Sequence, residues 1–104
     1  LRKDRLLVLG MHIPLFEEPD RDTFRDADRH RLFALLRDFP HVLVLSAHSH
    51  TQRHVLHDAV SGWQGTTPLH EYNVGAACGS YWAGAPDAEG IPSSTMADGT
   101  PNGY

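Results

Sequence analysis

Two short runs of apolar residues predict strands. Residues 5–9 read Arg-Leu-Leu-Val-Leu and residues 42–46 read Val-Leu-Val-Leu-Ser. Runs of this length that lack alternation are typical of strands buried on both faces of a parallel or mixed sheet. The pattern therefore predicts two inner strands, each flanked by more polar sequence.

The segment between these runs has the spacing of a helix over residues 26–39. Its apolar positions recur at i, i+3, i+4 and i+7, the stripe of an amphipathic helix; they are Leu32, Leu35, Leu36 and Phe39. Asp26 or Asp28 is suited to cap the first turn, and Pro40 is suited to end the helix. We expect the arginines of this segment, among them Arg29, on the solvent-exposed side of the helix.

A strand, a helix and a second strand in this order predict one crossover unit. A right-handed crossover makes the two strands parallel and brings their carboxyl ends to the same edge of the sheet. His12 follows the first strand, and His48 and His50 follow the second. Open α/β sheets bind ligands at that edge, so we expect these three imidazoles to lie close together there.

The remaining sequence is less regular. Residues 53–59 alternate weakly, Ser61-Gly62 predicts a turn, and residues 69–76 predict a further strand. The chain then becomes rich in Gly, Pro, Ser, Ala and Asp, which predicts an irregular segment. We therefore predict a domain part over residues 1–80 and a loop or linker toward a following domain over residues 81–104.

Composition excludes some classes of function. The formal net charge is −4, and no basic stripe is present, so nucleic acid is not expected as a stable partner. No apolar run approaches the roughly 20 residues that a membrane-spanning helix needs. Cys78 is the only cysteine, which excludes an internal disulfide, and we expect it to be a buried small residue. Tyr81-Trp82 is expected to anchor a Gly-rich loop, and the abrupt ends indicate a piece of a longer protein.

Histidine is the residue type that suggests chemistry. The chain has 8 histidines, and neutral imidazole is the commonest nitrogen ligand of transition metals. On an extended segment His48 and His50 would project to the same side and reach one metal or two adjacent metals. The metal ligands that we predict are His12, His48 and His50, and no catalytic residue is assigned.

The other histidines have weaker claims. His54 would complete a three-histidine zinc site with an open position, but we favour a half-exposed strand residue. His57 and His70 are weaker candidates still. His30 and His41 are expected at the surface beside the helix.

These residues resemble the calcineurin-like metallophosphoesterases. Residues 10–15, Gly-Met-His-Ile-Pro-Leu, resemble the family's fourth metal-binding block, and residues 47–50, Ala-His-Ser-His, resemble its fifth, normally Gly-His-x-His. Residues 73–82 and 98–104 resemble a bacterial subgroup with an extra C-terminal domain. Ala47 replaces the usual glycine, and the first three blocks of the family are absent.

The resemblance implies a fold and an activity. The fold would be α/β, the C-terminal half of a metallophosphoesterase-type α/β sandwich, with a strand-helix-strand unit, further strands and a Gly/Pro-rich tail. The parent protein would hydrolyse phosphate esters with two divalent ions, Mn, Fe or Zn. His12 and His48 would bind one ion and His50 the other. Residues 1–80 would be part of the catalytic domain, inactive without the rest.

The resemblance also implies partners, and two other functions stay open. The partners would be a phosphate ester substrate and the missing N-terminal half of the domain, and exposed strand edges would favour self-association. Localisation is unknown, with a lean to export or the periplasm in bacteria. The first alternative is a non-enzymatic module with one structural zinc bound by clustered histidines. The second is a scaffold domain whose histidines are incidental.

Overall fold

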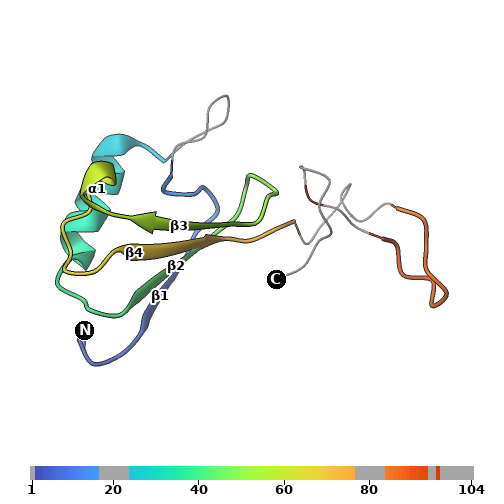
Figure 1. Ribbon diagram of the computed structural model, residues 1–104, viewed down its shortest axis with the longest axis horizontal. Helices are drawn as coiled ribbons and strands as arrows, with labels where there is room; N and C mark the ends of the chain where they lie inside the picture. Colours follow the sequence, from blue (N-terminus) through green and yellow to red (C-terminus); the bar gives the residue numbers. More distant parts are fainter. Residues whose placement is uncertain (1, 17–23, 77–83, 94–95, 97–104) are drawn as a thin grey trace.

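The fold is a four-stranded mixed sheet with one helix on it (Figure 1). The computed structural model describes residues 2–16, 24–76, 84–93 and 96. Its elements, in chain order, are β1 (Leu7–Gly10), α1 (Asp26–Leu36), β2 (Val42–Ser46), β3 (Arg53–His57), a 3₁₀ turn η1 (Ala59–Ser61) and β4 (Leu69–Asn73). The α/β class and the strand-helix-strand unit predicted from the sequence are confirmed.

Strand order explains how distant segments reach one edge. The order is β1-β2-β4-β3, with β1, β2 and β4 parallel and β3 antiparallel to β4. Because β4 is inserted beside β2, the carboxyl ends of three parallel strands lie at the same edge of the sheet. The predicted turn at Ser61-Gly62 is present, and Gly62 closes it with a φ of 88°.

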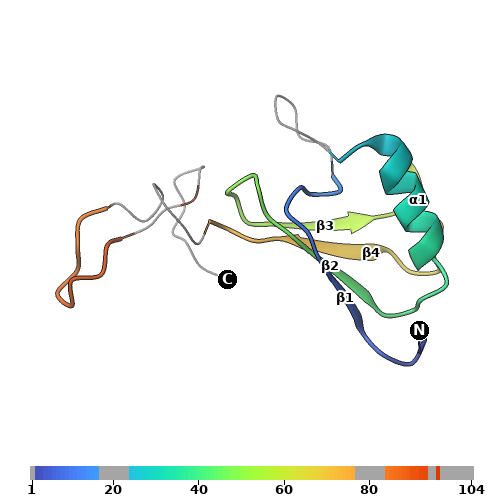
Figure 2. The ribbon, with the colours of Figure 1, turned by 180° about the vertical axis from the view of Figure 1, so that it is seen from behind.

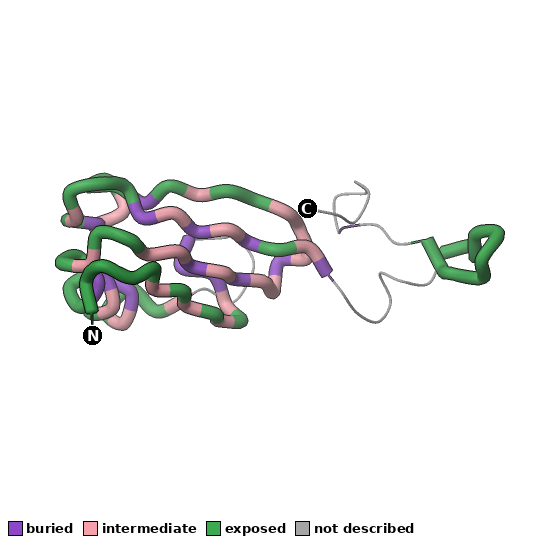
Figure 3. Tube along the Cα trace, turned by 90° about the horizontal axis from the view of Figure 1, so that it is seen from below, coloured by how far each residue is buried: buried purple, intermediate pink, exposed green. Residues whose placement is uncertain are grey.

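The core lies between α1 and one face of the sheet. Its buried side chains are Leu15, Phe33, Leu36, Val44, Trp63 and Leu69. Figure 3 shows the resulting alternation, since β4 is buried at every second residue. This face-by-face alternation identifies which strand residues support the core.

The helix differs from its prediction in three ways. It ends at Leu36 rather than residue 39, and Arg25 takes the N-cap position without a side-chain cap. Leu35 is 66% exposed, whereas Phe33 is buried, so the helix is rotated relative to the predicted stripe. Tertiary packing, with Phe33 against the ring of Trp63, decides the face that is buried.

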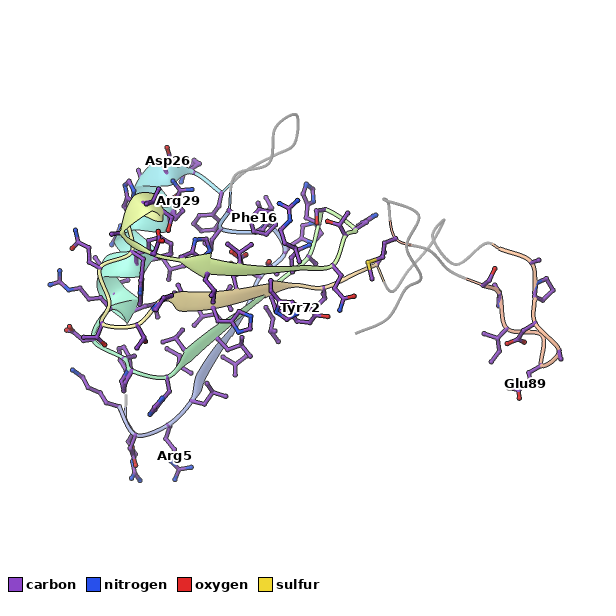
Figure 4. All side chains as sticks on the ribbon, in the orientation of Figure 1. Arg5, Phe16, Asp26, Arg29, Tyr72 and Glu89 are labelled. Carbon is purple, nitrogen blue, oxygen red and sulfur yellow. The ribbon has the colours of Figure 1, made fainter. Side chains whose placement is uncertain are left out.

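Arg29 is not on the wet side, as predicted, but buried. One guanidinium nitrogen donates to the carbonyl oxygen of Leu15 at 3.2 Å, and another pairs with Asp26 at 2.9 Å. Figure 4 shows Arg29 and Asp26 near each other at the start of α1. Its long stem crosses apolar surface while the two terminal guanidinium nitrogens are paired, which ties the helix to the loop after β1.

The second face of the sheet is open among the described residues. On it Val8 is 48% exposed and Leu56 is 63% exposed. The expectation that residues 5–9 are buried on both faces is therefore wrong for the described part of the chain: the strand begins at Leu7 and alternates, because α1 covers one face only. No helix of the described part is long and apolar enough to span a membrane.

Some predictions fall on residues that the structure does not describe. These are the burial of Cys78, the anchoring by Tyr81-Trp82 and most of the similarity over residues 73–82 and 98–104. Figure 2 shows residues 84–93 as a separate exposed turn beyond the end of β4, closed by a bridge between Pro86 and Pro92. The division at residue 80 stays a prediction.

Candidate metal centre

The ends of β1 and β2 bring His12 and His48 together. The Met11 N–H donates to the Leu45 carbonyl at 2.9 Å, and the Ala47 N–H donates to the His12 carbonyl at 3.1 Å. Strand pairing therefore continues past both strand ends and carries the two histidines into contact. The distance from His12 Nε2 to His48 Nδ1 is 2.9 Å, and the two rings meet edge to face. This juxtaposition confirms the geometric expectation for this pair.

The His-x-His segment is not extended, contrary to the prediction. β2 ends at Ser46, and His48 and His50 have φ values of 69° and 55°. The Ser49 N–H donates to the Ala47 carbonyl at 2.8 Å, which closes a tight turn around His48. A positive φ at the centre of such a turn is rare and strained outside glycine. Strain of this kind persists only where neighbouring structure imposes it.

Asn73, at the end of β4, imposes that structure. It is fully buried, and its amide nitrogen donates to Ser49 Oγ at 2.5 Å and to the Thr51 carbonyl at 2.6 Å. Its side-chain oxygen accepts from the Ser46 hydroxyl at 3.1 Å. One side chain thus holds the residues on both sides of His48 and His50, and sequence reasoning missed it.

A buried acid-imidazole pair lies one step further along the same face of β4. His57 Nε2 and Glu71 Oε2 are 2.6 Å apart, and neither side chain is more than 2% exposed. Glu71 also accepts from the Leu15 N–H at 2.9 Å. The Glu71 carboxylate therefore attaches the loop that follows His12 to β3 and β4.

Glu71 is held in its charged form by these contacts. Burial would raise the pKa of the carboxyl, but hydrogen bonds, the largest from His57 and another from the Leu15 backbone, outweigh burial and keep the pKa below its ordinary value. The sequence signal was a carboxylate at an alternate position of a strand, between Leu69 and Asn73. Glu71 thus has a structural role, since it binds His57 and the Leu15 N–H.

The donor set fits part of a metal centre. Metal–imidazole bonds are about 2.0–2.1 Å long, so two nitrogens at right angles on one ion lie about 2.9 Å apart. The His12–His48 contact is a hydrogen bond of that length, and it puts both rings within reach of one ion. In the described part of the chain no three His, Cys, Asp or Glu side chains form a metal-binding group, so His50 does not join this pair as a third ligand.

His54 does not support the three-histidine alternative. It lies on β3, as the favoured interpretation has it, and its Nδ1 is 2.9 Å from Nε2 of His70 on β4. The two rings therefore face each other on the sheet rather than the strand-end loop. His30 and His41 are exposed, as expected.

Comparison with known families bears on the whole site. The family model described as the C terminal of calcineurin-like phosphoesterase matches residues 71–104. Residues 71–104, about a third of the chain, are therefore similar to the C-terminal part of calcineurin-like phosphoesterases. The match begins at Glu71 and includes Asn73, so it contains two of the residues that hold the candidate centre. No curated protein and no solved structure matched.

This similarity agrees with the fold. A mixed sheet with one helix is consistent with a fragment of a metallophosphoesterase α/β domain. The similarity suggests a phosphoesterase-type hydrolase, and calcineurin-like phosphoesterases generally use metal ions. The matched residues follow His12, His48 and His50 in the sequence, so the match does not include these three histidines. The order of the strands in the sheet brings the segments that carry them to the same edge as the end of β4.

Proposed function

We propose that this chain supplies metal ligands to a phosphoesterase that hydrolyses phosphate esters. His12 and His48 would hold one divalent ion, and His50 would reach a second. The observation that carries the proposal is the 2.9 Å contact between two imidazole nitrogens at the carboxyl edge of parallel strands. The family match over residues 71–104 supplies the reaction class.

The chain's own contribution is the placing of imidazole lone pairs. Asn73 holds the loop of His48 and His50, and Glu71 holds the loop that follows His12. Bound Mn, Fe or Zn ions would supply Lewis acidity, charge neutralisation at the phosphoryl oxygens and a more acidic water near neutral pH. Ring positions that are fixed before the ion arrives lower the ordering cost of binding it.

The remaining ligands and the substrate are partners of this site. Two imidazoles leave most positions of an ion open, and the missing N-terminal half of the catalytic domain would fill them. We expect the chain alone to bind metal weakly and to hydrolyse phosphate esters poorly. Its β1 edge and the open face of the sheet would favour self-association, and export in bacteria is the proposed localisation.

A Zn²⁺ titration of the full chain tests the ligand assignment. It is best performed in a His70→Gln background, which removes the other close histidine pair. We expect His48→Ala to abolish the binding that remains and His41→Ala, at an exposed histidine, to preserve it. Equal Zn²⁺ binding by both variants would contradict the assignment.

Activity is the second readout. p-Nitrophenyl phosphate and bis-p-nitrophenyl phosphate report monoester and diester cleavage with added Mn²⁺ or Zn²⁺. We expect hydrolysis by the chain to stay near the buffer rate. Rapid turnover that survives His48→Ala would show that the reaction does not depend on this centre.

A further inference from the structure

A second pair of histidines lies on the open face of the sheet. His54 on β3 and His70 on β4 are diagonal neighbours, because His54 pairs with Tyr72 and His70 pairs with Leu56 in the antiparallel register. Diagonal residues on one face of a sheet are close enough for long side chains to meet. The facing atoms, His54 Nδ1 and His70 Nε2, are 2.9 Å apart.

That proximity puts both rings within reach of one metal ion. Bonds of about 2.0–2.1 Å at a right angle place two nitrogens about 2.9 Å apart, whereas a tetrahedral angle places them about 3.4 Å apart. The present 2.9 Å contact is a hydrogen bond between the two rings, so it shows that both rings reach one point without selecting a coordination geometry. In the present contact the two nitrogens share one proton, which an ion would replace after a rotation of each ring.

Neighbouring side chains orient the pair. The ring of Tyr72 stacks on that of His54, with centroids 4.5 Å apart and an interplanar angle of 16°. The Tyr72 hydroxyl in turn accepts a hydrogen bond from the Gln52 amide. Figure 4 labels Tyr72 on β4. A ring held from one side loses less freedom on binding, which favours chelation.

The pair is accessible and distinct from the candidate centre at the strand ends. Its hydrogen bond is exposed, and α1 covers the opposite face of the sheet. Among the described residues no third His, Cys, Asp or Glu completes a cluster here. Water would therefore occupy the remaining positions of a bound ion.

We propose that His54 and His70 form a two-histidine site for a divalent transition-metal ion, with Cu²⁺ as the strongest binder. Copper stands at the top of the affinity order for divalent ions at nitrogen sites. The site is independent of the phosphoesterase proposal, because its two ligands belong to neither strand-end loop. Two imidazoles on rigid strands act as a chelate rather than as two separate ligands.

Cu²⁺ titration by calorimetry tests the proposal in a His48→Gln background, which removes the strand-end pair. We expect His70→Gln in that background to weaken Cu²⁺ binding by about 100-fold, since the second ligand gains an effective concentration from the first. The matched control, His41→Gln in the same background, removes one exposed histidine and should leave the affinity unchanged. Equal affinities in the two double variants would overturn the proposal.

A spectroscopic measurement separates ligand loss from misfolding. Pulsed electron paramagnetic resonance of the Cu²⁺-loaded chain should report two coordinated imidazoles in the His48→Gln background and one after His54→Gln is added. Circular dichroism of the metal-free variants should be unchanged, because both side chains lie on the open face. A single imidazole before the His54 substitution would overturn the proposal.

Discussion

The two faces of β4 have different roles, although their residues alternate along one strand. Leu69, Glu71 and Asn73 face α1 and are at most 2% exposed, whereas His70 and Tyr72 face the open side and stay half-buried. Burying a polar group is costly unless it is hydrogen-bonded, and Glu71 and Asn73 are bonded to the segments after β1 and β2. The covered face therefore positions loops, and the open face presents side chains.

The two histidine pairs show the same contrast. Both have facing nitrogens 2.9 Å apart. His12 and His48 lie on loops, one of them strained, whose shape depends on buried side chains elsewhere. His54 and His70 lie on paired strands, where the register alone sets their separation. The two distances are equal but are set by different parts of the structure. Substitutions on the covered face should therefore disturb the His12–His48 pair and leave the His54–His70 pair in place.

The largest effect is expected when Glu71 is removed. Glu71→Leu leaves His57 and the Leu15 N–H without their buried acceptor, and breaking a buried pair costs about 3–5 kcal/mol in the free energy of unfolding. Its neighbour on the open face, His70→Leu, should change that free energy by about 0.5 kcal/mol. Urea unfolding of both variants measures the difference. Similar losses at the two positions would show that the faces are not distinct.

Asn73→Ala should have the next largest effect. It removes the donor of two hydrogen bonds and leaves buried partners at Ser49 and Thr51, which we expect to lower the free energy of unfolding by about 2–3 kcal/mol. Zn²⁺ affinity at His12–His48 should fall while Cu²⁺ affinity at His54–His70 persists. Tyr72→Phe, on the open face beside it, is the matched control for stability. Parallel loss of both metals in Asn73→Ala would contradict the separation.

Acidification should produce a smaller loss through the same covered face. The pKa of Glu71 is lower in the folded chain than the roughly 4.3 of an unperturbed glutamate. The unfolded state therefore binds the proton first, so the stabilisation is complete above the unfolded pKa, begins to fall below it, and is lost as the pH falls through the lower folded pKa. The gap in unfolding free energy between the wild type and Glu71→Gln should narrow below about pH 4.3. A gap independent of pH would exclude a charged Glu71.

The sequence predicted the framework because apolar runs and their order carry that information. Residues 42–46 became β2 within the predicted bounds, and parallel pairing with β1 brought His12 to His48. The phase of α1 was not predictable in this way, since Leu35 and Phe33 are equally apolar and packing against Trp63 chose between them. The local sequence pattern predicts which element forms, whereas tertiary contacts determine which face of the helix is buried.

The supporting polar residues were missed for a related reason. In residues 69–73, Leu-His-Glu-Tyr-Asn, both faces of the strand carry polar groups, so alternation does not reveal which face is buried. The left-handed backbone at His48 and His50 depends on Asn73, more than twenty positions away in sequence. The ligands were visible in the sequence, and the structure that holds them was not.

The smallest predicted effect tests whether strain is stored at the ligand itself. His48 has a φ of 69°, where glycine is about 1 kcal/mol more favourable than other residues. His48→Gly should therefore be more stable than His48→Ala by about that amount, although both lose the contact to His12. At exposed His41, which has no positive φ, the order should reverse because glycine adds freedom to the unfolded chain. Thermal unfolding of the four variants measures both orders. The same order at both positions would show that the turn holds no strain, whereas opposite orders would locate it at the ligand.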